Sequence, residues 1–324
     1  MSTIEDFRLT ASRVRNWGRW GDDDEIGTLN LITPAKVREG ASLVRQGKVF
    51  ALGVDFDGSG PQSAGGFRRN PIHLMTIDGG DANAFAEIAG LANPEISFLG
   101  RIFEKSIMRF NDDMIVMPLQ AATQWDALSH VYYEDRMYNG FPASAVTSFG
   151  ATKLAITAAD AKGITSRGVL LDVLRHRGVE RLGGESIGPE ELQAIADAQS
   201  VEIRSGDILC LRFGVWERFL ADRKMPQPAP GLSWRCAEWL HAREIAAVAA
   251  DNVAVEGPQE IDGAFLALHM LCLRDMGMMF GEMWNFAALA ADCAEDRVYE
   301  FQLIAPPLRV TGAVGSPLNP IALK

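Results

Sequence analysis

The chain has 324 residues, of which 48% are hydrophobic, and 42 acidic against 31 basic side chains give it a net charge of −11 at pH 7. This composition is typical of one large globular domain or two closely joined lobes, and so acidic a surface repels nucleic-acid phosphates. No apolar run reaches the roughly 18 to 20 residues of a membrane-spanning helix, and no signal segment is visible. We therefore expect a cytoplasmic protein with neither nucleic-acid nor membrane partners.

The first strongly predicted element is a helix over residues 33–48, because Thr33 suits the N-cap and Pro34 the first helical position. Short β-like runs follow at 48–56, 73–77, 112–118, 168–173, 207–214, 245–255 and 299–310. Several of them are almost wholly apolar, as in strands covered on both faces. Further helices are predicted at 188–200, 231–245, 264–276 and 282–296. The alternation of strands and helices predicts an α/β or mixed α+β fold.

Residues 57–70, DGSGPQSAGGFRRN, form a predicted loop because they are rich in Gly, Ser and Pro. Loops of this length are either binding lids or plain surface excursions. If this loop or the N-terminal segment folds over a site, Trp17, Trp20 and Phe67 would line it. The alternative is that these three aromatic side chains only contribute packing.

Several kinds of functional motif are missing from the sequence. It has no phosphate-binding loop, no nucleophile elbow and no dinucleotide-binding glycine motif. The four cysteines lie far apart among apolar neighbours, which predicts buried free thiols rather than disulfides or a zinc knuckle: Cys210, Cys236, Cys272 and Cys293. The remaining candidates for chemistry are metal ligands.

Candidate metal ligands lie in two segments. In the stretch LQAATQWDALSH, Asp126 and His130 follow an apolar run with the spacing D-x-x-x-H, which on a turn or helix brings the two side chains together. His269 precedes Glu282 by thirteen residues in a segment too apolar to hold an unpaired charge at low cost. One interpretation is a metal site. The other is that His269 is a hydrogen-bonded core residue and Glu282 caps the following helix.

The spacing of Gln120, Gln124, Asp126 and His130 resembles the H-x-x-x-H-x-D-x-x-x-H motif of the metal-dependent cyclase family, which includes bacterial kynurenine formamidase and isatin hydrolase. Other stretches are similar to the longer-chain members of that family. They are NWGRWGDDDEIGTLNLITP at residues 16–34, GITSRGVLLDV at 163–173, and the closing pair His269 and Glu282. The resemblance covers nearly the whole chain.

Membership of this family implies a single domain over residues 1–324, with an N-terminal extension of about 1–47 packed on its core. The implied fold is α/β, with a mixed β-rich core and surrounding helices of the swivelling β/β/α type. The resemblance also implies a homodimer or homotetramer that acts on a small-molecule substrate.

The implied activity is hydrolysis of a C–N bond, as in an amide or cyclic amide, or of an ester or lactone, in a small cyclic or aromatic substrate. The resemblance implies a Mn²⁺ or Zn²⁺ cofactor with Asp126, His269 and Glu282 as ligands. Such an ion polarises a carbonyl and lowers the pKa of water from 15.7 to about 7. His130 corresponds to the histidine that transfers the proton, a task that suits imidazole.

Gln120 and Gln124 stand where the formamidase and isatin hydrolase have histidine ligands. An amide oxygen is a neutral and weaker donor than imidazole, so we expect a site built towards oxygen ligands that holds one ion rather than two. Thr123, before the second of these positions, is expected to hydrogen-bond near the ligands. Trp125 is expected to be a pocket wall or a core residue.

Asp251 and Glu256 lie at the end of the predicted strand 245–255, where α/β sites gather, but they are equally interpreted as solvated loop acids. Two alternatives to a hydrolase also stay open. One is a lyase or cyclase, in which the metal stabilises an enolate. The other is a metal-free binding protein that kept the fold.

Overall fold

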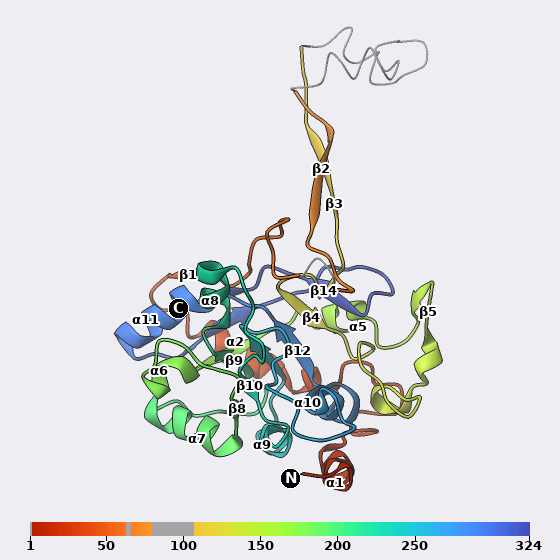
Figure 1. Ribbon diagram of the computed structural model, residues 1–324, viewed down its shortest axis with the longest axis vertical. Coiled ribbons are helices and arrows are strands. Elements are labelled where there is room, and N and C mark those ends of the chain that lie inside the picture. Colours follow the sequence, from red (N-terminus) through yellow and green to blue (C-terminus); the bar gives the residue numbers. More distant parts are fainter. Residues whose placement is uncertain (1, 63–65, 80–106) are drawn as a thin grey trace. The chain divides into compact units, whose positions relative to one another are not determined.

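The computed structural model describes residues 2–62, 66–79 and 107–324 (Figure 1). They divide into two compact units, one of Met1–Asp55 with Leu119–Lys324 and one of Phe56–Pro118. All predicted site residues except Phe67 belong to the first unit. Within the described residues, every helix is too short or too polar to span a bilayer.

A mixed sheet of nine described strands forms the centre of the first unit, in the order β1-β15-β13-β7-β9-β11-β12-β4-β14. Their bounds are β1 Val49–Ala51, β15 Ile321–Leu323, β13 Glu300–Ile304, β7 Thr165–Asp172, β9 Ile208–Arg212, β11 Ala247–Ala250, β12 Met279–Glu282, β4 Gln124–Asp126 and β14 Gly315–Pro317. The four central strands β7, β9, β11 and β12 run parallel, and the outer strands pair antiparallel. The predicted α/β class with a β-rich core is confirmed.

Apolar side chains cover both faces of the central strands. Val169 and Leu171 of β7 belong to one buried cluster, whereas Leu170 between them belongs to the other. Successive strand residues point to opposite faces, so a wholly apolar strand needs a core on each side. The prediction of strands covered on both faces is confirmed for these central strands.

Helices surround this sheet in Figure 1. The α-helices of the first unit are α1 Ile4–Val14, α2 Pro34–Ala41, α5 Ile156–Asp160, α6 Val173–Arg177, α7 Pro189–Ala198, α8 Val215–Asp222, α9 Cys236–Ala242, α10 Ala267–His269 and α11 Ala287–Asp296, and α10 continues into the π-helical turn η4 Met270–Met276. The oxygen Oγ1 of Thr33 caps α2 by accepting from the backbone N of Lys36, as predicted, although the helix ends at Ala41. The four cysteines are buried and free, as predicted.

The helix predicted at 282–296 is wrong at its start, because α11 begins only at Ala287. Residues 279–282 form β12, which pairs with β11 on one side and β4 on the other. These two sets of sheet hydrogen bonds outweigh the local helical pattern. Glu282 therefore ends a strand, and the interpretation of Glu282 as a helix cap is wrong.

The second unit contains the antiparallel ribbon of β2 Ile72–Ile77 and β3 Asp112–Val116. Both strands are predicted from the sequence, but neither is covered on both faces, since nearly all of their residues are exposed. Phe67 lies in the preceding loop, where its side chain is 93% exposed.

Candidate metal centre

Two neighbouring antiparallel strands bring three polar side chains to one face of the sheet. The register of β12 and β4 pairs Glu282 with Gln124 and Phe280 with Asp126. Residues two apart on a strand point to the same face, so the side chains of Gln124, Asp126 and Glu282 converge. All three are at least 97% buried.

Trp125 points to the opposite face of β4 from these side chains. Its partner in the register is Gly281, where an added Cβ would lie 2.9 Å from the indole ring. The ring packs against Trp284 at a centroid distance of 5.0 Å, and its Nε1 donates to the carbonyl of Ala305 at 2.8 Å. These contacts favour the core interpretation of Trp125 over the pocket wall.

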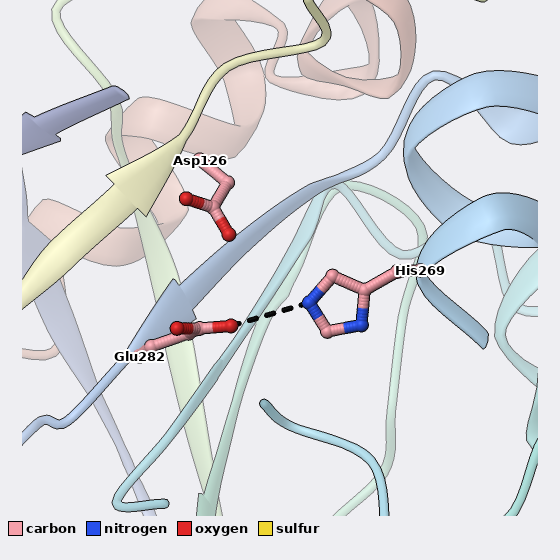
Figure 2. Close-up of side chains that lie close together, drawn as sticks. All are labelled: Asp126, His269 and Glu282. Atoms are coloured by element: carbon pink, nitrogen blue, oxygen red, sulfur yellow. Dashed lines mark hydrogen bonds and ion pairs between the residues drawn. The ribbon is translucent and has the colours of Figure 1, made fainter. Parts of the chain in front are cut away.

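The last residue of α10 completes the cluster. Figure 2 shows Asp126 and Glu282 extending from their strands towards the ring of His269. The Nε2 atom of His269 lies 3.2 Å from Oε1 of Glu282, and potential ligand atoms of all three residues lie within 4.8 Å of one another. The structure thus brings together the three side chains that the resemblance names as ligands.

Carboxylates flank both nitrogens of the His269 ring. Its Nδ1 atom lies 3.0 Å from Oε1 of Glu256, on the side opposite Glu282. Burial lowers the pKa of His269, but the hydrogen bonds to Glu256 and Glu282 outweigh burial and raise it to about 10. The cluster therefore favours a positive charge among its carboxylates.

Gln124 joins the two strand carboxylates. Its Nε2 donates to Oδ1 of Asp126 at 3.1 Å and to Oε2 of Glu282 at 3.0 Å. Oε1 of Gln124 and Oδ2 of Asp126 are buried without a hydrogen-bond partner among the residues that the structure describes. Buried oxygen acceptors with no donor, beside an imidazole nitrogen, are the kind of ligand set that can hold a metal ion.

Gln120 lies on the same side of the sheet as Asp126. Gly315 of β14 pairs with Asp126, and a Cβ added to this glycine would lie 2.5 Å from Nε2 of Gln120. The absence of a side chain at Gly315 thus leaves room for the Gln120 amide on this side of the sheet.

His130 lies in the turn after β4, where its backbone N donates to the carbonyl of Ala127. Its Nε2 atom is 3.8 Å from Oδ1 of Asp126, so the D-x-x-x-H spacing does bring the two side chains together. The His130 side chain is 23% exposed, whereas that of Asp126 is 1% exposed. The role of His130 in proton transfer stays a prediction. A side chain between a buried carboxylate and the solvent is suitably placed for that role.

The hydroxyl of Thr123 makes two hydrogen bonds with backbone atoms of other segments. Its Oγ1 donates to the carbonyl of Met283 at 2.6 Å and accepts from the backbone N of Val54 at 3.0 Å. The first bond holds the start of β4 against the end of β12, and the second ties it to the segment that follows β1. A direct contact of Thr123 with substrate stays a prediction.

Trp17 and Trp20 make other contacts within the first unit. Trp17 donates from Nε1 to the carbonyl of Arg274, and the Arg19 guanidinium lies over the Trp20 ring at 4.7 Å. Phe67 belongs to the second unit. A role for any of them in substrate binding stays a prediction.

Neither Asp251 nor Glu256 is a solvated loop acid, and that interpretation is wrong. Asp251 is fully buried and accepts from the backbone N of Phe213 and of Gly214. Burial, followed by the charge of Glu217, raises the pKa of Asp251 to about 8. Glu256 is 7% exposed and contacts His269, a pairing that the sequence spacing alone does not reveal.

The fold and the cluster together define a mixed α/β protein with a buried His and carboxylate centre. The family model described as "Putative cyclase" matches residues 70–257. The structure is similar to a crystal structure described as a novel cyclase, with 39% identity and a TM-score of 0.83 over 96% of this chain and 100% of that one. The chain belongs to the cyclase family, as the resemblance predicts.

Two more distant structures show the same fold. Isatin hydrolase A from Labrenzia aggregata, bound to benzyl benzoate, has 15% identity and a TM-score of 0.58, covering 85% of this chain and 93% of that one. An isatin hydrolase bound to the product analogue thioisatinate has 16% identity and a TM-score of 0.57, covering 90% and 95%. No curated protein sequence matches significantly.

Proposed function

We propose that this protein is a metal-dependent hydrolase that opens a C–N, ester or lactone bond in a small cyclic or aromatic substrate. The observation that supports it most is the convergence of buried Asp126, His269 and Glu282, whose ligand atoms lie within 4.8 Å of one another. Membership of the cyclase family and the isatin hydrolase neighbours support the reaction class.

In this proposal Asp126, His269 and Glu282 hold one Mn²⁺ or Zn²⁺ ion. The bound ion would polarise the substrate carbonyl and make water more acidic. Gln124, whose Nε2 bridges Asp126 and Glu282, keeps the two carboxylates at a fixed separation. Gln120, whose amide approaches Gly315 opposite Asp126 in the strand register, would offer a further oxygen ligand.

His130 moves the proton in the proposed reaction. It accepts a proton from the attacking water as the new C–O bond forms at the carbonyl carbon. It then returns that proton to the leaving nitrogen or oxygen as the C–N or C–O bond breaks, so no other acid or base is required. Its position beside Asp126 and its partial exposure support this role.

A substrate panel tests the proposal. Chelator-treated protein is assayed with formanilides, cyclic imides, lactones and isatin-like compounds, without metal and with added Mn²⁺ or Zn²⁺. We expect ring opening or amide cleavage that depends on metal. Metal-dependent elimination or cyclisation with no hydrolysis would favour the lyase or cyclase instead.

One observation favours a different class of function, a metal-free binding protein. The amide nitrogen of Gln124 already donates to both Asp126 and Glu282, and buried carboxylates need such donors when no cation is bound. Metal content distinguishes the two proposals, measured on protein purified without chelator or histidine tag. Near-stoichiometric Mn or Zn supports the hydrolase, whereas no metal and no change in Tm on adding it support the binding protein.

We also propose that the protein forms a homodimer or homotetramer. On one face of the ribbon, Ile72 pairs with Val116 and Leu74 pairs with Met114, and each of the four is 46% to 50% exposed. A two-stranded ribbon is marginally stable alone, so a second copy of the chain that covers this apolar face would stabilise it. Location in the cytoplasm stays a prediction from the sequence.

A further inference from the structure

Glu256 is a buried carboxylate in a loop after β11, and both of its oxygens are used at α10. Oε1 lies 3.0 Å from Nδ1 of His269, and Oε2 accepts from the backbone N of Leu268 at 2.7 Å. Because Leu268 directly precedes His269, one carboxylate holds both the ring and the backbone next to it. The imidazole is thus fixed relative to its own helix.

The backbone of Glu256 is itself held tightly against β10 Gly231–Leu232. Leu232 donates to the carbonyl of Val255 and accepts from the backbone N of Gly257, both at 2.9 Å. A Cβ added to Gly231 would lie 2.3 Å from the carbonyl carbon of Glu256, so only glycine allows this approach. The carboxylate is therefore presented from a rigid segment.

The two ring nitrogens of His269 have different surroundings. Nδ1 faces Glu256, whereas Nε2 faces Glu282 and the group of candidate ligands. A histidine that binds metal through one nitrogen commonly donates the other N–H to a carboxylate, which fixes the tautomer and the ring orientation. The Phe280 ring packs edge-on against the imidazole at 4.9 Å and limits its rotation.

We propose that Glu256 is a positioning residue that holds His269 with Nε2 directed towards Glu282, so that Asp126, His269 and Glu282 together would hold a divalent ion. This inference rests on the proposed function, because it assigns a task to Glu256 within the proposed metal site. In this proposal Glu256 is neither a metal ligand nor a catalytic residue. It acts through the orientation of His269.

The test compares two substitutions of Glu256 with a control in the same loop. Glu256→Gln keeps the size of the side chain but offers one oxygen instead of two, so either Nδ1 or the Leu268 N–H loses its acceptor. Glu256→Leu removes both acceptors. The control is Glu260→Gln, since Glu260 is exposed and accepts from Oγ of Ser233 at 2.9 Å.

Two measurements are made on each chelator-treated variant. Calorimetric titration with MnCl₂ is expected to show affinity about 10-fold weaker for E256Q and about 100-fold weaker for E256L, with E260Q unchanged. Crystal structures without metal are expected to show the His269 ring of E256L turned so that Nε2 no longer lies within hydrogen-bond distance of Glu282. Mn²⁺ affinity within about twofold of the wild type in both variants, with the ring in place, would overturn the inference.

The ring orientation also separates this inference from the proposed function. If wild-type protein binds neither Mn²⁺ nor Zn²⁺, the proposed function fails, and the position of the His269 ring in E256L alone decides whether Glu256 positions it. A turned ring then supports the inference and an unmoved ring overturns it. If E256L does not fold, the same two measurements on E256Q decide.

Discussion

The amide nitrogen of Gln124 lies 3.0 Å from Oε2 of Glu282 and donates a hydrogen bond to it, across the pair of strands β4 and β12. The same nitrogen donates to Oδ1 of Asp126, so one neutral group donates to two buried carboxylates. A buried carboxylate that loses a donor has a large desolvation cost. Gln124 therefore stabilises the centre when no ion is bound.

We expect Gln124→Leu to lower the free energy of unfolding of the metal-free protein by about 1 to 3 kcal/mol, because both carboxylates lose a buried donor. Urea unfolding of chelator-treated protein measures this change. Gln46→Leu is the matched control, since it removes a glutamine bond to a carboxylate, Asp296, at the exposed surface. Equal stability of the Gln124→Leu variant and the wild type would show that the bridge is unimportant.

We expect one tightly bound divalent ion per subunit. Within the part of the chain that the structure describes, Asp126, His269 and Glu282 form one set of charged or imidazole ligands, and the neighbouring Gln120 and Gln124 offer only neutral amides. Calorimetric titration with Mn²⁺ and with Zn²⁺ gives the stoichiometry. Two sites of similar affinity would contradict this prediction.

Glu282→Ala is expected to weaken metal binding by more than tenfold. Losing a direct ligand should weaken binding more than losing a residue that only hydrogen-bonds to a ligand. The affinity is measured by competition with a chromophoric chelator. Glu295→Ala, on the exposed surface of α11, provides the control. An affinity equal to that of the control would remove Glu282 from the site.

Leu74→Glu in the ribbon is expected to reduce the oligomer to a smaller species, because it places a charge on the apolar face shared with Met114. Light scattering after size-exclusion chromatography gives the molecular mass. Met75→Glu is the matched control, since Met75 is 46% exposed and, as the next residue of β2, points to the opposite face. If both variants keep the wild-type mass, this face is not the interface.

Local sequence patterns predict part of the centre and miss the rest for physical reasons. The approach of His130 to Asp126 follows from four-residue spacing and a turn, which are local. The strand position of Glu282 depends on pairing with β4, which lies about 160 residues away in the sequence, so a helical pattern at 282–296 is misleading. The residue pattern leaves a metal site at Asp126, His269 and Glu282 as one of two interpretations, and the family resemblance is what favours it.

The contact of Glu256 with His269 could not be predicted from the sequence, although the place of Glu256 at the end of a predicted strand made it a candidate site residue. It contacts His269 because β11 ends at Ala250 and the loop then returns along β10 to the start of α10. The charged side chain looks solvated when judged by its neighbours in the chain. Its burial depends on the close approach of Gly231 to the backbone of Glu256, which exists only in the folded chain.

His130→Ala is expected to separate metal binding from turnover. In the proposed mechanism His130 transfers the proton and is not a required ligand, so its loss should leave the fold and the metal occupancy nearly intact. The turnover number should fall by roughly 10²- to 10⁴-fold, the usual contribution of general acid–base catalysis. Steady-state kinetics and metal analysis of the same preparation measure both quantities.

His73→Ala is the control for His130→Ala, because His73 is an exposed histidine in the second unit that bonds to Asp113. It should keep both metal and turnover. If His130→Ala loses its metal together with its activity, His130 is a ligand beside Asp126, His269 and Glu282, a geometry that its 3.8 Å distance from Asp126 would permit after a small movement. If it keeps full activity, another group transfers the proton, and the mechanism proposed for His130 is wrong.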